Sequence, residues 1–200
     1  MDLMQNLDAI DQGRIDDVVT SSPSVSGTRP APLVSSSLST TQRRAWSAIE
    51  SVWTYLHSRL EAELHRECGM TAFEYELLEL LSQEGAPTPM SSVAHRVNSS
   101  LSRLSHVVRR LEERGWVRRR TSPEDARVTL VSLTGKGAMR FADSVATYER
   151  MVNEYFLQHL NDPELEATTE ICVRILRSLH GNHWLVEELE ADGITGSPSA

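Results

Sequence analysis

The sequence predicts a mainly α-helical protein: a winged helix-turn-helix domain with a two-stranded β-wing, flanked by long dimerisation helices. Three successive features support this fold class. A short apolar helix is predicted over 90–97, a break follows at 98–99, and a basic helix over 100–114 leads into a hairpin-like run over 117–133. This order is typical of domains whose second helix fits the major groove of DNA. The sequence therefore indicates a DNA-binding regulator.

The first two helices are predicted from apolar residues that recur at steps of three and four. Such spacing covers residues 46–64, and Gly69 is expected to end this long helix, because glycine tolerates the left-handed conformation of a helix terminus. Thr71 and Glu74 have the spacing of a capping box, which predicts the start of the second helix. The Gly-Ala-Pro run at 85–87 is expected to end it.

The next two helices and the wing complete the predicted domain. Thr88 is the expected N-cap of the third helix and Pro89 its first residue, where a missing N–H is tolerated. Gly115 closes the basic fourth helix. Helical spacing predicts its buried stripe at Leu104, Val108 and Leu111, with Leu101 as a candidate extension. The two strands around the wing tip are predicted from Val117, Val128, Leu130 and Leu133.

After the wing, two further long helices are predicted. Thr134 caps the fifth, whose apolar side extends to His159, and the Asp-Pro pair at 162–163 begins the sixth. The domain with its dimerisation helices thus covers 43–180. Residues 1–42, acidic and then Ser-rich, cannot bury enough apolar surface to offset their ordering entropy and are expected to form a disordered tail, and 181–200 a short C-terminal tail.

The charge of the chain is unevenly distributed. The whole sequence carries a formal charge of −8, but 93–140 holds eleven basic residues against four acidic ones, a net charge of +7, which leaves −15 for the remainder. A local cationic island suits phosphate contact, because a charge is felt in salt solution only within about 8–10 Å. The alternative is a solvated helix face that is rich in arginine.

Other sequence features limit the class of function. No apolar run approaches the length of about eighteen residues that suggests a membrane span, and the N-terminus lacks a secretory signal, so we expect a cytoplasmic, nucleoid-associated protein without membrane contact. Cys68 and Cys172 are too few for a disulfide framework. Motifs for a phosphate-binding loop, a nucleophile elbow, a zinc protease or a dinucleotide site are absent. We therefore predict no enzyme, no cofactor and no metal site.

Two motifs in this stretch resemble the MarR family of bacterial transcription regulators. The sequence SPEDAR at 122–127, followed by VSLTGKG at 131–137, is similar to the family's Asp-x-Arg wing tip, the strand after it and a Leu-Thr-x-x-Gly helix start. The combination of SRLSH at 102–106 with LEERGWV at 111–117 is similar to the end of its recognition helix. The resemblance covers about 43–180 and implies a homodimeric regulator of double-stranded DNA, most often a repressor, which in many members binds a small aromatic or anionic effector. The long N-terminal tail departs from the family's compact form.

The exposed face of the basic helix is the predicted DNA-reading surface. Ser99 and Ser100 lie at its start, where free backbone N–H groups attract phosphate. Arg103 is the candidate for a base edge, because a guanidinium can donate two hydrogen bonds to guanine, and a phosphate contact is the equal alternative. The other candidates on this face are Ser102, His106 and Arg110, whereas Arg109 is expected to face neighbouring helices.

The wing supplies a second group of candidates. Arg127 is expected to enter the minor groove, which is electronegative in A·T-rich DNA. Asp125, which DNA repels, is expected to pair with the Arg127 guanidinium and hold it in position. Arg118, Arg119 and Arg120 would attract phosphates, or would only protect a solvated strand edge from pairing. A winged-helix protein-interaction module without sequence-specific DNA binding is the alternative function, and the arginine-rich wing argues against it.

A dimer is predicted through the first, fifth and sixth helices, and an effector site between the dimerisation and DNA-binding parts. A two-fold dimer would place the basic helices in successive major grooves and predicts a pseudo-palindromic site. The candidates for an effector cavity are Trp46, Trp53, His57 and Tyr75, although the spacing of these residues also fits core packing. Cys68 is a candidate redox sensor near Arg66, with a buried, idle thiol as the alternative.

Overall fold

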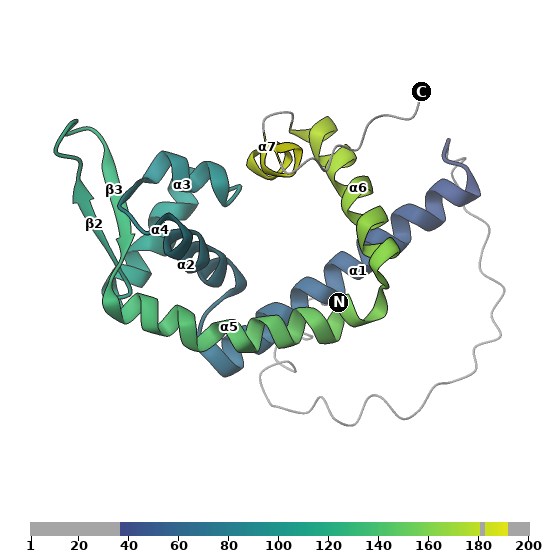
Figure 1. Ribbon diagram of the computed structural model, residues 1–200, viewed down its shortest axis with the longest axis horizontal. Helices are drawn as coiled ribbons and strands as arrows, with labels where there is room; N and C mark the ends of the chain where they lie inside the picture. Colours follow the sequence, from purple (N-terminus) through teal and green to yellow (C-terminus); the bar gives the residue numbers. More distant parts are fainter. Residues whose placement is uncertain (1–36, 181–182, 192–200) are drawn as a thin grey trace, which may run out of the picture. The chain divides into compact units, whose positions relative to one another are not determined.

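The computed structural model describes residues 37–180 and 183–191, which are mostly helical with one small sheet (Figure 1). The chain divides into a first unit, 1–43, and a second unit, 44–200, which holds all elements except the start of the first helix. The predicted N-terminal tail, 1–42, lies outside the described residues up to residue 36, as do 181–182 and 192–200 of the predicted C-terminal tail. The predicted boundary at 42 is wrong, because the first helix already begins at Thr40.

The described elements follow one another in the order that the sequence predicts, with β1 and α7 added and with the short helices η1 and η2 directly after α1 and α5. They are α1 (Thr40–Glu63), the π-helix η1 (Leu64–Cys68), α2 (Ala72–Glu84), β1 (Thr88–Pro89), α3 (Met90–Arg96), α4 (Leu101–Glu113), β2 (Val117–Thr121), β3 (Thr129–Leu133), α5 (Gly135–Tyr155), the 3-10 helix η2 (Leu157–His159), α6 (Asp162–Leu179) and α7 (Trp184–Ala191).

The predicted helix termini around α2 are confirmed. Gly69 and Gly85 both have a φ of +61°, the left-handed conformation that a glycine adopts without strain after a helix. The Thr71 hydroxyl accepts the backbone N–H of Glu74 at 3.1 Å, and the Glu74 carboxylate accepts the N–H of Thr71 at 3.0 Å. This reciprocal pair is the predicted capping box, and it fixes where α2 begins.

The start of α3 differs from the prediction. Thr88 and Pro89 do not open the helix but form β1, which pairs antiparallel with β3 through Thr88–Val131 and Pro89–Leu130. The sheet therefore has three strands, in the order β1-β3-β2, rather than the two of the predicted wing. Proline is compatible with this place because β1 is an edge strand, where one side of the ladder needs no N–H donor.

The helix-turn-helix packs around an apolar core. Leu104, Val108 and Leu111 of α4 are fully buried, as predicted, and Val107 is buried beside them. The predicted extension by Leu101 is wrong: its side chain is 52% exposed, because the core ends one turn into the helix. Figure 1 shows α2, α3 and α4 beside the hairpin of β2 and β3, with α5 starting at the base of this wing.

In its described part, the C-terminal half differs from the prediction at three places. Thr134 caps α5, as predicted, by accepting the N–H of Gly137 at 3.0 Å, but α5 ends at Tyr155. The N-cap of α6 is Asn161, one residue before the predicted start. Residues 184–191, predicted as part of a tail, form α7.

The long helices α1 and α6 contribute little to the core. In α1 the one buried residue is Glu63, and in α6 it is Val173. Large apolar side chains remain exposed on both helices: Trp46, Ile49, Val52, Trp53 and Tyr55 on α1, and Ile171, Ile175 and Leu179 on α6. Within the described part of the chain, none of the helices combines the length and the apolar character that crossing a bilayer requires.

Candidate nucleic-acid interface

The turn between α3 and α4 positions the start of the recognition helix. Asn98 has a φ of +47° and reverses the chain at the predicted break. The N–H of Ser99 donates to the carbonyl of Ala94 at 2.9 Å, which closes the turn. Ser100 is the N-cap of α4, and its hydroxyl accepts the N–H of Arg103 at 3.2 Å. The predicted residues Ser99 and Ser100 therefore lie at the helix start, where backbone N–H groups can meet an anion.

The predicted reading face of α4 is exposed. Its four candidates, Ser102, Arg103, His106 and Arg110, are all exposed. The Arg103 guanidinium lies 4.6 Å from the centre of the Phe73 ring, which orients this side chain without neutralising it. Arg109, expected to face neighbouring helices, is instead exposed, with a guanidinium nitrogen 3.3 Å from Nδ1 of His106.

The buried carboxylate of Glu74 forms ion pairs with two arginines of the basic stretch 93–140. Glu74 is 1% exposed, and its oxygens lie 3.5 Å from the Arg110 guanidinium and 3.2 Å from that of Arg114. A buried carboxylate needs such partners, because an unpaired charge is costly to remove from water. Arg110 therefore has a structural role that the sequence did not reveal, since Glu74 is far from it along the chain.

The three consecutive arginines of β2 have different neighbours. Arg119 is held by Glu112, which accepts hydrogen bonds from its Nε and a terminal nitrogen at 2.9 and 2.7 Å and from its backbone N–H at 2.9 Å. These hydrogen bonds lower the pKa of the Glu112 carboxyl. Arg118 donates to the Ser132 hydroxyl at 3.3 Å, and Arg120 forms no ion pair with a described carboxylate. Because β2 is an edge strand, its exposed arginines also fit the alternative role, which is to keep that edge from pairing with another strand.

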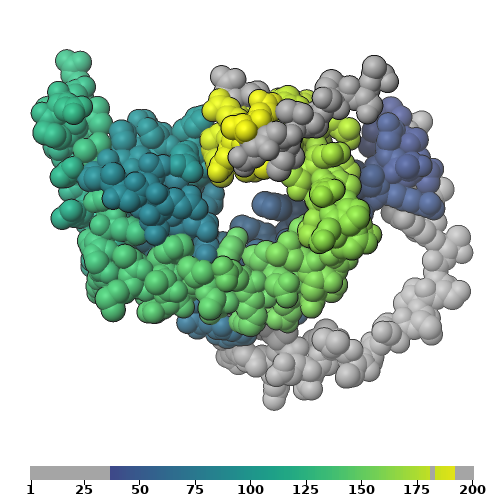
Figure 2. Space-filling view, viewed as in Figure 1, coloured from purple at the N-terminus to yellow at the C-terminus, as the bar shows by residue number. Residues whose placement is uncertain are grey.

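The wing tip is shaped by backbone hydrogen bonds. The N–H of Ser122 donates to the Val128 carbonyl at 2.8 Å, and the Val128 N–H donates to the Asp125 carbonyl at 2.9 Å. The sequence predicted an ion pair between the side chains of Asp125 and Arg127, and this prediction is wrong. The Asp125 carboxylate instead accepts the backbone N–H of Arg127 at 2.9 Å. Asp125 thus fixes the turn and leaves the Arg127 guanidinium exposed. Figure 2 shows the wing protruding beyond the neighbouring helices.

Five arginines of the helix-turn-helix and the wing are exposed and form no ion pair with any carboxylate of residues 37–180 or 183–191. We call them the unpaired arginines: Arg103, Arg109, Arg118, Arg120 and Arg127. The island is less basic than its count suggests, because Glu74 and Glu84, outside the counted range, pair with three of its arginines. On α4 and the wing, the positive charge that has no described carboxylate partner is carried by the unpaired arginines.

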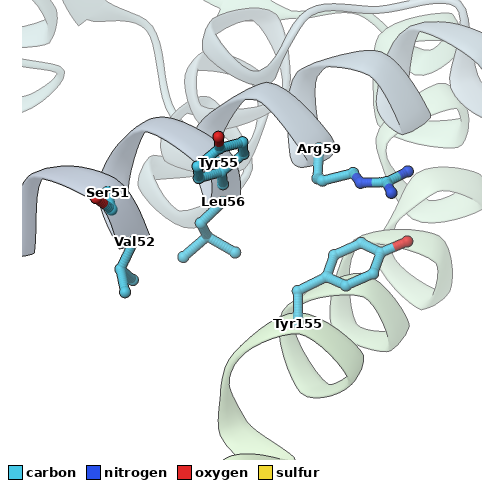
Figure 3. A pocket seen from close by; sticks show the side chains of 6 residues that line it. All are labelled: Ser51, Val52, Tyr55, Leu56, Arg59 and Tyr155. Carbon is cyan, nitrogen blue, oxygen red and sulfur yellow. The ribbon is translucent and has the colours of Figure 1, made fainter. Parts of the chain in front are cut away.

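The four candidates for an effector cavity are not brought together. Trp46 and Trp53 are exposed on α1, where Trp53 stacks on His57 with ring centres 5.6 Å apart. Tyr75 is 2% exposed and stacks on Tyr148 at 4.1 Å, so it fills the core. An open pocket lies elsewhere, lined by Ser51, Val52, Tyr55, Leu56 and Arg59 of α1 and by Tyr155 of α5 (Figure 3).

The cysteine candidate is buried. Cys68 is a free thiol in the core at the end of η1, and its carbonyl accepts a hydrogen bond from Arg140. This burial favours the idle thiol over the redox sensor, since sensors need an accessible thiolate. Among the described side chains, no group of three or more metal-ligating residues is arranged to hold an ion.

Comparisons with known proteins agree with this geometry. The model of the MarR family matches residues 70–129. The HTH-type transcriptional regulator MhqR of Bacillus subtilis is 26% identical over 120 residues, which are 60% of this chain and 81% of MhqR. The crystal structure of AbsC, a MarR family transcriptional regulator from Streptomyces coelicolor, has a TM-score of 0.70 at 30% identity, covering 74% of this chain and all of AbsC.

A second solved structure is described as a complex. Sco3205, a MarR family transcriptional regulator from Streptomyces coelicolor crystallised with DNA, has a TM-score of 0.69 at 27% identity, over 74% of this chain and 99% of its own. Both solved structures match the winged helix-turn-helix together with the long helices, since each covers 74% of this chain. The chain belongs to the MarR family, whose members are transcription regulators and not enzymes.

Proposed function

We propose that this regulator binds double-stranded DNA as a homodimer, with α4 in the major groove and the wing along the minor groove. The observation that carries the proposal is the placement of the unpaired arginines, which all lie on α4 and the wing and leave their charge available for phosphate. The DNA complex of the similar Sco3205 supports it. Such a protein would work at the nucleoid in the cytoplasm.

On α4 the proposed contacts divide by position. Ser99 and Ser100 would bind phosphate through the helix start, and His106 would donate to phosphate from the next turn. Arg103, with Ser102 beside it, is the proposed reader of base edges, because a guanidinium can donate two hydrogen bonds to guanine. The stacking of Arg103 on Phe73 supports this role, since it restrains the side chain before binding. Arg110 would contribute less to phosphate binding, because its ion pair with Glu74 partly neutralises its charge.

The neighbouring arginines of β2 provide a matched test of the wing. Arg120→Ala should weaken DNA binding and reduce the dependence of the binding constant on salt by about one phosphate contact. Arg119→Ala should have a smaller effect, because Glu112 already neutralises that guanidinium. Glu112→Gln should strengthen binding, because it removes a negative charge and frees Arg119. Fluorescence anisotropy over a salt series measures all three; equal losses for the two arginine variants would contradict the assignment.

The homodimer is proposed from the exposed apolar side chains of α1 and α6. Trp53 alone is 67% exposed, and Trp46 and Leu179 leave similar fractions in water. Large exposed apolar side chains in such number often mark a protein interface, and a second copy of the chain brings the same helices. A two-fold dimer would place two α4 helices about 34–36 Å apart, one turn of DNA.

The dimer predicts a mass and a sensitive position. Light scattering at micromolar concentration should give twice the mass of the chain. Trp53→Glu should shift the protein towards monomer and weaken DNA binding, because it places a charge within the proposed apolar interface. Glu50→Gln, which keeps the size of another exposed side chain of α1 and adds no charge to the apolar residues, is the control. A monomer mass for the unchanged protein would remove the dimer from the proposal.

We further propose that the regulator is a repressor, released by a small aromatic or anionic effector. Support comes from the pocket beside α1, where the Arg59 guanidinium offers a charge to an anion and Tyr55 and Tyr155 offer rings (Figure 3). Phenolic acids titrated into the DNA complex should then lower its affinity, and Arg59→Gln should abolish this effect without changing the affinity in the absence of acid. If no phenolic acid changes DNA binding, this part of the proposal fails.

A further inference from the structure

The C-terminal helix is attached to the turn of the helix-turn-helix. His183, immediately before α7, is 5% exposed, and its Nε2 lies 2.8 Å from the side-chain amide of Asn98. The next residue, Trp184, donates its indole N–H to the carbonyl of Arg96 at 2.7 Å, and the Arg96 guanidinium lies 5.1 Å from the centre of the indole ring. Two successive residues therefore anchor α7 where α3 ends.

Asn98, which His183 contacts, has an unusual backbone conformation. Asn98, with its φ of +47°, is the one residue other than glycine that has a positive φ in the described part of the chain. A side chain makes this conformation unfavourable, and it persists where the surroundings hold it. Asn98 directly precedes Ser99 and Ser100, the start of the recognition helix. His183 thus supports the turn that sets the direction of α4.

The hydrogen bonds of His183 define its protonation state. Its Nδ1 accepts the backbone N–H of Leu185 at 3.2 Å, and its carbonyl accepts the N–H of Val186 at 2.9 Å, so the residue caps the first turn of α7. A ring nitrogen that accepts a hydrogen bond carries no proton. The neutral ring therefore has its proton on Nε2. The amide group of Asn98 lies at 2.8 Å with its nitrogen facing Nε2, and we assign its oxygen and nitrogen as exchanged, so that the oxygen accepts this proton.

A second proton on the ring would oppose both contacts of α7. It would sit on Nδ1 and face the N–H of Leu185, so that two donors would meet and the cap would be lost. It would also place a positive charge at the N-terminus of α7, where the helix dipole is unfavourable for cations. Docking of α7 is therefore compatible only with the neutral ring.

The groups packed around His183 do not offset this cost. His180 at the end of α6 lies 5.9 Å away between ring centres, and His95 of α3 lies 6.1 Å from His180. Burial, followed by these two histidines, lowers the pKa of His183. The nearby cation is Arg96, which is paired with Glu84 of α2. The other α2 carboxylates, Glu76 and Glu79, line a pocket beside Trp184 and Arg96.

We propose that His183 is a proton-sensitive brace, which holds α7 and the Asn98 turn in place when neutral and releases both when protonated. The brace rests on the proposed DNA binding and adds regulation to it: acid should weaken DNA affinity. The pKa of His183 is lowered from 6.5 in the docked state, so this state binds fewer protons. Docking is then fully favoured above that value and is weakened as the pH falls below it.

The test compares the full chain with His183→Gln, which keeps a neutral donor and acceptor but cannot take up a proton. DNA affinity is measured for both at about pH 7.5 and 5.5, the range in which histidine titrates. Between these values the affinity of the unchanged protein should fall about fivefold relative to the variant, the equivalent of one hydrogen bond. His106, which gains charge in acid and attracts DNA, is present in both proteins, so the ratio isolates His183. A ratio that does not change with pH overturns the brace.

Amide hydrogen exchange tests the brace without DNA. In the unchanged protein, acid should reduce the protection of α7 and of the turn at 97–100, after correction for the intrinsic rate. Asn98→Asp should make the loss of protection in acid smaller, because an aspartate opposite His183 offsets part of the cost of the positive charge on the ring. Unchanged protection of α7 in acid, or an equal loss of protection in Asn98→Asp, overturns the proposal. If no duplex binds at any pH, the proposed function fails, while exchange still decides whether His183 holds α7.

Discussion

Replacing Gly137 by alanine should disrupt the junction between the wing and α5 and lower the free energy of unfolding by about 3 kcal/mol or more. A Cβ at this position would lie 1.9 Å from the carbonyl oxygen of Trp116 and 2.8 Å from its carbonyl carbon. These are backbone atoms next to the start of β2, so they cannot move without displacing the strand. The hydroxyl of Thr134, which accepts the N–H of Gly137, also donates to the Gly115 carbonyl at 2.7 Å.

The same helix offers a matched control. Gly135 is the first residue of α5, and a Cβ there would meet no atom within 4 Å. Gly135→Ala should therefore leave the stability unchanged or raise it by up to about 1 kcal/mol, since alanine restricts the unfolded chain. Urea unfolding followed by circular dichroism compares the two variants. Similar stabilities would show that the close approach of α5 to β2 is not as tight as described.

Arg127→Ala should cause the largest loss of DNA affinity among the single substitutions of the wing, about tenfold or more. The backbone N–H of Arg127 is held by Asp125, so the base of the side chain is fixed while its guanidinium stays exposed and unpaired. The fixed backbone reduces the ordering cost of its entry into the minor groove, whose negative potential attracts arginine. The salt dependence of binding should decrease by about one phosphate equivalent.

Two further substitutions separate the parts of this prediction. Arg127→Lys keeps the charge and should retain the salt dependence, but it should lose preference for A·T-rich flanks if the guanidinium reads a narrow groove. Asp125→Ala should weaken binding although it removes a negative charge, because the wing tip loses the hydrogen bond that shapes it. Anisotropy titrations on one duplex measure all three. If Arg127→Ala leaves both affinity and salt dependence unchanged, the wing assignment is wrong.

Features set by neighbouring residues could be predicted from the sequence. The capping box of Thr71 and Glu74, the helix end at Gly69 and the N-cap at Thr134 are all confirmed, because each depends on residues within four positions along the chain. The break at Asn98 is confirmed for the same reason. Local hydrogen bonding decides these positions, and the residue types that satisfy it are few.

Features set by distant contacts could not be predicted. β1 forms because Thr88 meets Val131, and no local pattern at Thr88 announces a strand of two residues. Helix α7 is attached to α3 through Trp184 and Arg96, which are far apart in the sequence.

The candidate site shows the same division. The exposure of Arg103 follows from helical periodicity, whereas Arg109 was expected to face neighbouring helices and is exposed. Which arginines are neutralised does not follow from periodicity, because Glu74 reaches Arg110 and Arg114 only in the folded protein. Asp125 illustrates a finer difference: the sequence indicated that it serves Arg127, but not that its carboxylate binds the backbone N–H. Counting charges therefore overestimated the positive surface while locating it correctly in the chain.

Selection of bound duplexes from a random pool, followed by titration of the enriched site over a salt series, tests the central claim most directly. We expect a pseudo-palindromic site with half-sites about one helical turn apart. The logarithm of the binding constant should fall linearly with the logarithm of salt concentration. A purified protein that enriches no sequence and binds no duplex, even at low ionic strength, would contradict the proposed role of α4 and the wing.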